Sequence, residues 1–311
     1  MSRPAVDLRV QLGPLELANP IVTASGTFGH GAEVARLCDP TRLGAVTAKS
    51  QAPFAWAGNP APRLHPSACG LVNAVGLQGN GIEHWIAHDL PALRALGARV
   101  IASIWGRSTE DFARAAELLV PVKAELMALE VNLSCPNLQH DDTIFAHDPR
   151  ATNEVMRNVT QIATVPVFAK LAPGVTELVH VAGAALQGGA DGLTLVNTVR
   201  ALLVDAELRR PVLGSAGGGL SGAAIKPIAL RAVYEVTQAH RGVPVIGTGG
   251  VSSGVGAVEM LLAGATAVGV GTATFAEPRA ALRILAELED WCARHGVTHA
   301  AELIGGLRMH A

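Results

Sequence analysis

Amide, hydroxyl and thiol side chains follow an apolar run near the middle of the chain. Residues 128–133 have the near-continuous apolar character of a strand buried on both faces, and residues 132–137 read Asn-Leu-Ser-Cys-Pro-Asn. Pro136 cannot donate a ladder hydrogen bond, so the strand is expected to end there. Polar groups and a nucleophile at a strand's carboxyl end are typical of a ligand-binding site. In the alternative interpretation, the asparagines cap backbone groups and Cys135 packs as a small apolar residue.

Two of the few lysines also stand at predicted strand ends. Lysine occurs only at positions 49, 123, 170 and 226, and Lys49 and Lys170 each close an apolar run. Either one alone could simply extend its amine to solvent. Two at equivalent positions favour a shared site, where desolvated cations would neutralise an electron-rich ring, a carboxylate or a phosphate.

Glycines gather near the last three predicted strands, in Ser215–Gly222, Gly247–Gly250 and Gly269–Thr272. A single cluster of this kind commonly serves a turn. Together, the clusters place backbone N–H groups beside helices expected to begin near Ser253 and Glu277. That arrangement is the usual phosphate site of an α/β barrel, so the ligand is expected to carry a phosphate.

A further loop, between residues 62 and 80, is rich in glycine and amides. Asn73 and the backbone at Gly76 could hold a planar polar substrate, although Asn73 could also act only as a turn former.

Strand-like and helix-like segments alternate along the chain and predict how these residues are positioned. This alternation predicts a (β/α)8 TIM barrel of parallel strands, with a doubly wound sheet as the alternative. The expected strands are Pro20–Ala24, Ala45–Lys49, Arg99–Trp105, Ala128–Leu133, Val165–Leu171, Gly192–Val196, Pro244–Thr248 and Ala265–Val270. The expected helices are Ile82–Leu96, Thr109–Val120, Pro149–Ala163, Glu177–Gln187, Ala224–Ala239, Gly254–Ala263 and Pro278–Arg294.

An N-terminal β-hairpin and three long loops complete the expected barrel. Val6–Val10 and Leu15–Leu17 flank a Gly-Pro turn and should close the barrel bottom. The long irregular stretches are Ser50–Gly81, Pro136–Asp148 and Val199–Gly222. Each follows a strand, so all three should lie on the C-terminal face, where barrels build their active sites.

Composition favours one domain, residues 1–311, that acts on a small molecule. The chain has 311 residues, 49% of them hydrophobic, a formal net charge of -2 and only 16% charged residues. No basic stripe is present, so nucleic acid and membrane surfaces are not expected partners. No signal-like apolar run opens the chain, which predicts a cytoplasmic protein. The cysteines at 38, 69, 135 and 292 have no spacing typical of a metal or iron–sulfur site.

The chain resembles class 1 dihydroorotate dehydrogenases, and most of all the catalytic subunit of class 1B, in motifs that follow one another in the family's order. The resemblance rests on Asn19-Pro20, residues 24–29, Gly58-Asn59-Pro60, residues 73–77, residues 132–137, residues 189–192, Asn197-Thr198, residues 218–222, Lys226-Pro227 and Gly264-Ala265. It implies a barrel that binds FMN and oxidises dihydroorotate to orotate in pyrimidine (UMP) biosynthesis.

The resemblance also implies roles for individual residues, with Cys135 as the catalytic base. FMN would be held by Ser25, Lys49, Ser50, Asn132, Lys170, Val196, Gly222, Gly249, Gly250, Gly271 and Thr272. Substrate would be held by Lys49, Asn73, Ala74, Val75, Gly76, Leu77, Asn132, Asn197 and Thr198. These roles agree with the chemistry, because a cation such as Lys170 favours a reduced, anionic flavin and side-chain amides match the edges of orotate.

The chain departs from the family pattern at three places, two single residues and one three-residue segment. Ser103 stands where an asparagine is expected against flavin, Trp105 replaces a small residue, and His140-Asp141-Asp142 replaces a glycine-bearing segment. None of these changes removes a catalytic group. They raise the question of how tightly the flavin packs and how the loop after Cys135 moves. His140 and His147 lie in or near that loop and are expected to be solvated rather than catalytic.

The resemblance leaves the electron acceptor open. Class 1B relatives pass electrons to NAD through a second subunit with FAD and an iron–sulfur cluster, whereas class 1A relatives use fumarate, and we favour the former. A homodimer core is expected. Two further hypotheses are a barrel lyase or isomerase that forms a Schiff base at Lys49 or Lys170 on a phosphorylated substrate, and a flavin-carrying subunit without its own turnover.

Overall fold

Eight parallel strands form the centre of the computed structural model, which describes residues 6–134 and 145–308. The strands, in spatial order, are β3 (Ile21–Thr23), β16 (Ala267–Val270), β15 (Val245–Thr248), β10 (Gly192–Leu195), β9 (Val167–Leu171), β8 (Ala128–Asn132), β7 (Val100–Ile104) and β4 (Val46–Thr47). The sheet closes on itself because Val22 bridges Ala45 in parallel and the Gly44 N–H donates to the Ile21 carbonyl at 2.8 Å. All eight predicted strands are confirmed, and the (β/α)8 barrel replaces the doubly wound alternative.

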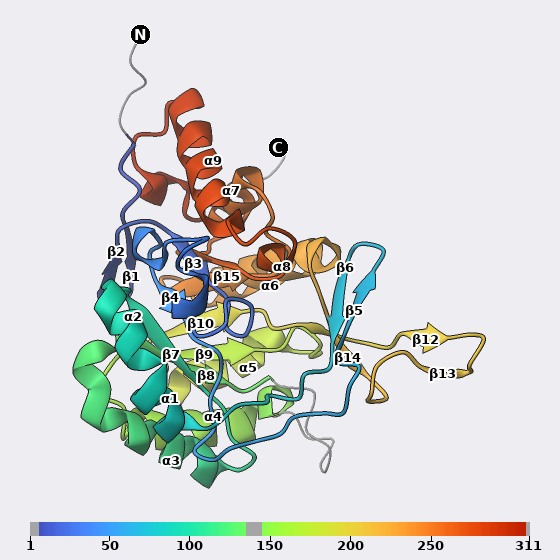
Figure 1. Cartoon of the computed structure of the whole chain (residues 1–311). Helices are drawn as coiled ribbons and strands as arrows, with labels where there is room; N and C mark the ends of the chain where they lie inside the picture. The colour runs from blue at the N-terminus through green and yellow to red at the C-terminus, as the bar shows by residue number, and fades with distance from the viewer. Residues whose placement is uncertain (1–5, 135–144, 309–311) are drawn as a thin grey trace.

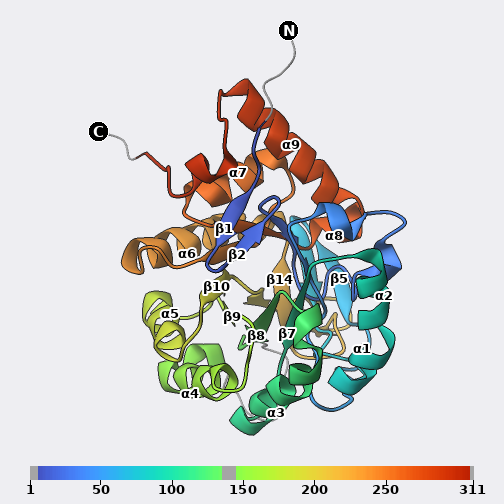
Figure 2. The same ribbon diagram turned by 90° about the vertical axis from the view of Figure 1, so that its left-hand side faces the viewer.

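Helices surround the barrel, as Figure 2 shows down its axis. They are α1 (Ile82–His88), α2 (Leu90–Leu96), α3 (Thr109–Leu119), α4 (Pro149–Thr160), α5 (Leu178–Gln187), α6 (Lys226–Ala239), α7 (Gly254–Leu262), α8 (Ala273–Ala276) and α9 (Ala280–Arg294). Within residues 6–134 and 145–308, no helix has the length and apolar character needed to cross a bilayer.

Two details of the predicted helices are wrong. The helix expected over residues 82–96 is two helices that meet at Asp89, because Pro91 lacks the N–H that would continue the first one. The first crossover, between β3 and β4, carries only the short 3₁₀ helices η1 (Ala32–Val34) and η2 (Pro40–Arg42). The expected alternation of strand and α-helix therefore begins after β4.

The bottom of the barrel is apolar and is closed by the N-terminal hairpin, as predicted. The hairpin strands are β1 (Val10–Leu12) and β2 (Leu15–Leu17), which pair antiparallel. Their buried side chains pack with a floor of inward-facing strand residues that includes Ile101, Ala128 and Phe168. The first strand begins at Val10 rather than Val6, because Asp7 pairs with the C-terminal segment instead, donating its N–H to Thr298 O at 2.8 Å.

The next layer inside the barrel is polar. Side chains alternate along each strand, so the residue two positions after a floor residue also points inward. These positions carry buried polar side chains, namely Ser103, Glu130, Lys170 and Thr248. A polar layer directly above an apolar floor prepares the upper end of the barrel to bind a ligand.

A second sheet covers the C-terminal face, where the sequence predicted only irregular loops. Its strands are antiparallel, in the order β11 (Val199–Ala201), β14 (Gly218–Ser221), β6 (Gly70–Asn73) and β5 (Leu64–Ser67). A small core of Val72, Ala74 and Leu213 lies beneath it. We call this sheet the cap. It brings the first and third predicted long loops together (Figure 1).

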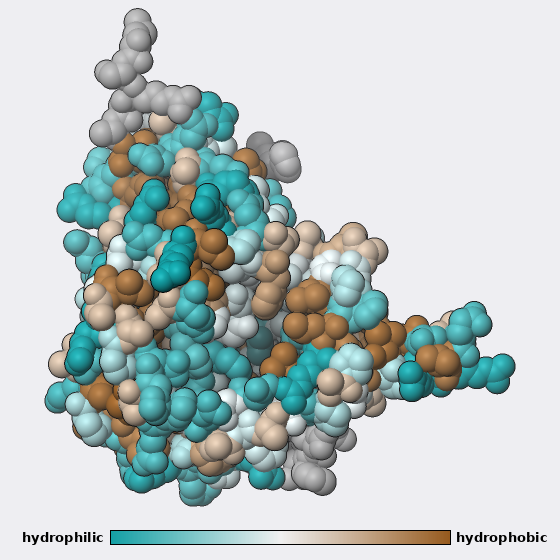
Figure 3. All heavy atoms as spheres, viewed as in Figure 1, coloured by the Kyte–Doolittle hydropathy of each residue, from teal (hydrophilic) through white to brown (hydrophobic). Residues whose placement is uncertain are grey.

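A narrow arm, residues 202–213, extends from the cap away from the barrel (Figure 1). It contains the short antiparallel pair β12 (Val204–Asp205) and β13 (Arg210–Pro211). Hydrophobic surface is visible on the arm in Figure 3, and Leu202, Val204 and Leu208 are each more than half exposed.

Candidate active site

A large cavity lies between the upper ends of the barrel strands and the cap. Its empty space, including the part that is open to solvent, is about 1110 Å³. The predicted site residues that line it are Ser25, Lys49, Ser50, Asn73, Val75, Gly76, Leu77, Asn132, Lys170, Val196, Asn197, Thr198, Gly222, Gly249, Gly250, Gly271 and Thr272. Side chains from distant parts of the chain therefore meet as the strand-end pattern predicted.

Two predicted site residues are not placed at the cavity. Ala74 is fully buried in the small core of the cap and is absent from the cavity wall. Its side chain faces away because neighbouring residues of an extended segment alternate, and Asn73 and Val75 take the inward positions. Cys135 lies outside the described residues, as does the segment His140-Asp141-Asp142.

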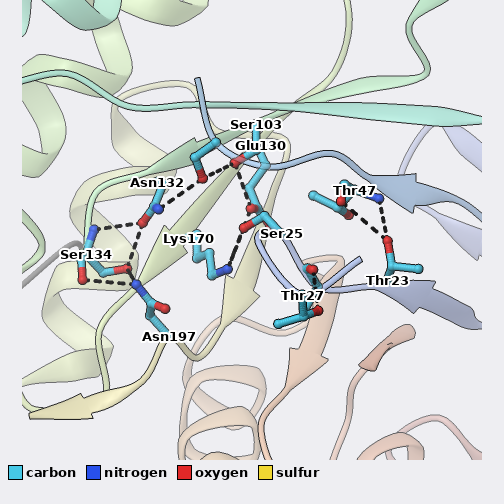
Figure 4. A network of polar contacts seen from close by, with 12 residues as sticks. Thr23, Ser25, Thr27, Thr47, Ser103, Glu130, Asn132, Ser134, Lys170 and Asn197 are labelled. Carbon is cyan, nitrogen blue, oxygen red and sulfur yellow. Dashed lines mark hydrogen bonds and ion pairs between the residues drawn. The ribbon is translucent and has the colours of Figure 1, made fainter. Parts of the chain in front are cut away.

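Lys170 stands at the centre of the cavity floor. Its Nζ donates to Ser25 Oγ at 2.9 Å and lies 3.8 Å from Glu130 Oε1. Figure 4 shows Ser25 and Glu130 next to the Lys170 ammonium group. The Lys170 side chain is only 5% exposed, so its charge is poorly screened by water and acts strongly on any group bound above it.

Hydroxyl groups connect this ion pair to the strand-end amide. Ser103 Oγ donates to Glu130 Oε1 at 3.1 Å and lies 2.9 Å from Ser50 Oγ, and Asn132 Nδ2 donates to Ser50 Oγ at 3.2 Å. Ser103, the first departure from the family pattern, therefore lies in the polar layer, where its small side chain connects Glu130 to Ser50.

Two amides hold the chain immediately before Cys135. Ser134 donates from its backbone N–H and its Oγ to Asn132 Oδ1, at 3.4 and 3.2 Å. Asn197 Nδ2 donates to Ser134 O at 3.0 Å and to Ser134 Oγ at 2.9 Å. We call Asn132, Ser134 and Asn197 the amide clamp (Figure 4). It fixes the position of Ser134, the last described residue before Cys135 in the sequence.

The predicted substrate segment, residues 73–77, forms the opposite wall. Asn73 Nδ2 donates to the Gly219 carbonyl at 3.2 Å, which ties the segment to the cap. Trp56 Nε1 donates to the Gly76 carbonyl at 2.9 Å. Leu77 has a φ of 61°, a conformation that is strained for a branched side chain and is found mainly at functional segments.

The glycine-rich wall comes from the strands predicted to hold a phosphate. Gly249 and Gly250 follow β15, Gly271 and Thr272 follow β16, and all four line the cavity. The helix expected to begin near Glu277 is α9, which begins at Ala280, and an additional short helix, α8, begins directly after Thr272. The Thr248 hydroxyl, buried in this wall, has no hydrogen-bond partner among the described residues.

Trp105, the second departure, does not line the cavity. It is buried in an aromatic cluster, edge-on to Phe54 at 5.8 Å and to Trp56 at 6.1 Å between ring centroids. Trp56 in turn donates to Gly76, so the large indole at position 105 supports the substrate segment from behind. The concern that Trp105 would crowd a flavin directly does not apply to this arrangement.

Two histidines near the site are shifted toward their neutral forms. Burial lowers the pKa of His30, which lies 3.9 Å from Asp89, and this outweighs the opposite influence of nearby carboxylates. Burial and, secondarily, the positive charge of Arg200 lower the pKa of His147. Neither histidine lines the cavity.

Sequence reasoning assigned no role to Glu130, Ser134 or Thr248. The signal for Glu130 was present, because a carboxylate in the middle of an otherwise apolar strand needs a buried partner. Nothing in the sequence pairs it with Lys170, which comes from another strand. Among residues 6–134 and 145–308, no group of three or more His, Cys, Asp or Glu side chains could hold a metal ion.

Comparisons with known proteins agree on one family. A family model described as dihydroorotate dehydrogenase matches residues 7–291. Three similar proteins are each named dihydroorotate dehydrogenase B (NAD(+)), catalytic subunit. The protein from Geotalea daltonii is 44% identical and the one from Geobacter metallireducens 42%, both over 99% of this chain and 100% of theirs. The one from Alkaliphilus metalliredigens is 41% identical over 97% of this chain and 99% of its own.

Proposed function

The chain belongs to the dihydroorotate dehydrogenase family, and we propose that it is an FMN-dependent catalytic subunit that oxidises dihydroorotate to orotate in pyrimidine biosynthesis. The observation that carries the proposal is a buried lysine and a set of amides around one cavity, in a chain similar to named catalytic subunits over its whole length. Family membership sets aside the hypothesis of a Schiff-base lyase.

The cavity fits FMN in three respects. The glycine-rich wall at Gly249, Gly250 and Gly271 leaves room for a phosphate beside backbone N–H groups. The unpartnered Thr248 hydroxyl offers a hydrogen bond to a bound group. Lys170 supplies positive charge on the floor, where Ser25 orients it. When bound, FMN supplies a two-electron acceptor for hydride.

The opposite side of the cavity fits the substrate. Orotate and dihydroorotate are small rings with amide edges and a carboxylate, which match amide and ammonium side chains. We assign Lys49, Asn73, Asn132, Asn197 and Thr198, together with the backbone of residues 75–77, to the substrate. Ala74 supports this wall from the cap core rather than from the cavity.

We assign the proton transfer to Cys135, the residue that follows the amide clamp in sequence. Hydride removal from carbon 6 leaves a proton on carbon 5 that a base must take. An unperturbed thiol has a pKa of about 8.5, which leaves a few per cent of thiolate at neutral pH. Enzyme activity should therefore rise with pH until the Cys135 thiol is ionised.

The relatives' names support NAD as the final acceptor through a partner subunit. We propose that this subunit carries FAD and an iron–sulfur cluster and that it binds at the cavity mouth. Phe275 and Leu64 line the cavity yet are 54% and 47% exposed. Large apolar side chains exposed beside a cofactor site are suited to a protein contact. The exposed apolar side chains of the arm support a homodimer core.

A single preparation tests the cofactor, the turnover and the acceptor. The chain is purified alone and with its partner subunit, the extracted flavin is identified, and dihydroorotate oxidation is measured with NAD and with fumarate. We expect FMN, turnover of the isolated chain with an artificial acceptor, and NAD reduction only with the partner. Fast fumarate reduction by the isolated chain would favour class 1A chemistry. Bound FMN without any turnover would support the flavin-carrying subunit instead.

A further inference from the structure

Glu130 is a buried carboxylate that has no role in the proposed mechanism. It lies in the polar layer of the barrel, with its side chain 3% exposed, and it is absent from the residues that line the cavity. Its Oε1 accepts a hydrogen bond from Ser103 at 3.1 Å and lies 3.8 Å from Lys170 Nζ. Lys170 lines the cavity and Glu130 does not, so the carboxylate is in contact with the lysine and not with the cavity.

A buried charge is stable only when it is paired. Transferring a carboxylate or an ammonium from water to a protein interior is so costly that an isolated group changes its protonation state instead. The other buried inward-facing side chains of this layer, Thr47, Ser103, Thr194 and Thr248, are uncharged. Glu130 is thus the negative group placed to balance Lys170 within the described part of the barrel.

The charges of Lys170 and Glu130 together determine the electrostatic potential at a ligand bound above the lysine. A ring that gains negative charge on reduction is stabilised by the ammonium and destabilised by the carboxylate behind it. The two groups also differ in position, because Lys170 reaches the cavity wall and Glu130 does not. The carboxylate therefore acts through the lysine and at longer range.

We propose that Glu130 is the counter-ion of Lys170, a positioning residue that keeps the ammonium charged and aimed at Ser25 and that moderates the positive charge offered to the flavin. The part concerning flavin rests on the proposed function. The part concerning the charge of Lys170 does not, and it can be measured on the chain without cofactor.

Two variants separate charge from packing. Glu130→Gln keeps the shape of the side chain and an oxygen that can accept from Ser103, but it removes the negative charge. Ser103→Ala removes the hydrogen-bond donor to Glu130 and leaves both charges in place. A merely structural role for Glu130 predicts that the two variants behave alike.

The first measurement is the reactivity of Lys170 in the flavin-free chain. Amines are labelled with a limiting amount of acetic anhydride at neutral pH, and modified peptides are quantified relative to the exposed Lys123. Only the uncharged amine reacts, so loss of the counter-ion should raise the labelling of Lys170 relative to Lys123 about tenfold or more in Glu130→Gln. Ser103→Ala should stay within about threefold of the unsubstituted chain. An unchanged ratio in Glu130→Gln would overturn the counter-ion assignment.

The second measurement is the reduction potential of bound FMN. Glu130→Gln should raise the equilibrium constant for reduction by about tenfold or more, which is 29.6 mV for a two-electron couple. The same substitution in a Lys170→Met background should change it by less than about threefold, since an isolated buried carboxylate takes up a proton and Glu130 would then have no charge to lose. Equal shifts in both backgrounds would contradict an action through Lys170. Failure of the unsubstituted chain to bind FMN would overturn the proposed function and the flavin part of this inference, and the labelling result would stand by itself.

Discussion

At the scale of single residues, the amide clamp makes a sharp prediction. Asn197 Nδ2 donates to both oxygens of Ser134, immediately before Cys135. Asn197→Asp keeps the size of the side chain but replaces the donor by a negative oxygen. The displaced segment, together with the lost amide contact to the substrate, should lower kcat/KM for dihydroorotate by about 10²-fold or more. Asn153→Asp is the control, because Asn153 donates to the Ala184 carbonyl on the helical side of the barrel. Equal losses in the two variants would contradict the clamp.

Site residues were predictable from the sequence where an apolar strand ends in polar side chains. Lys49, Asn132 and Lys170 were assigned from apolar runs that end in polar groups, and all three line the cavity. The partner of each side chain was not predictable, because a hydrogen bond such as that of Lys170 to Ser25 depends on closing the barrel across 145 residues. The position of Ala74 away from the cavity has a simple cause, since a contiguous segment was assigned although its side chains alternate.

At the scale of elements, the cap has a small core of its own and should loosen independently of the barrel. Leu213→Ala removes a nearly buried side chain from the core with Val72, which should cost about 2 to 5 kcal/mol locally. Hydrogen exchange of β6 and β14 amides should rise about tenfold or more, and the KM for dihydroorotate should increase. The thermal midpoint should change little.

The matched control for the cap is Leu288→Ala, which opens a cavity under α9. It should lower the thermal midpoint and leave exchange in β6 and β14 at its original rate. If Leu213→Ala lowers the midpoint as much as Leu288→Ala does, the cap and barrel unfold as one unit and the prediction is wrong.

Barrel strands were predictable because each is a short apolar run with a helix after it. The cap strands were not, since β5 and β14 contain the exposed or glycine-rich sequences Leu-His-Pro-Ser and Gly-Gly-Leu-Ser. β14 is a strand because it pairs with β6 across a long separation in sequence, as Gly219 does with Asn73. β5 pairs with the same strand through a short hairpin, in which Ser67 lies opposite Gly70. Local propensity does not carry such information.

At the scale of the whole molecule, the arm predicts the oligomeric state. Val204 and Leu208 are 62% and 58% exposed, and the arm also carries Asp205, Glu207, Arg209 and Arg210. A two-fold interface brings the same surface of both chains together, and an arm that carries both acidic and basic side chains allows opposite charges to meet there. Replacing Val204 and Leu208 together by aspartate should therefore turn a dimer into a monomer in sedimentation experiments.

The control for the arm is Val255→Asp, which places one aspartate on an exposed apolar residue of α7. It should remain dimeric. An unsubstituted chain that sediments as a monomer, or an arm variant that sediments as a dimer, would contradict the assignment of this surface.

The central claim is that dihydroorotate reduces a flavin held in this cavity. The most direct measurement mixes the FMN-loaded chain with dihydroorotate under anaerobic conditions and follows the visible flavin absorbance while orotate is quantified. The account predicts bleaching with one orotate formed per flavin, and a rate about 10² to 10⁴-fold lower in Cys135→Ala, which loses its general base. A flavin that stays oxidised with dihydroorotate, yet is reduced by dithionite, would contradict the account.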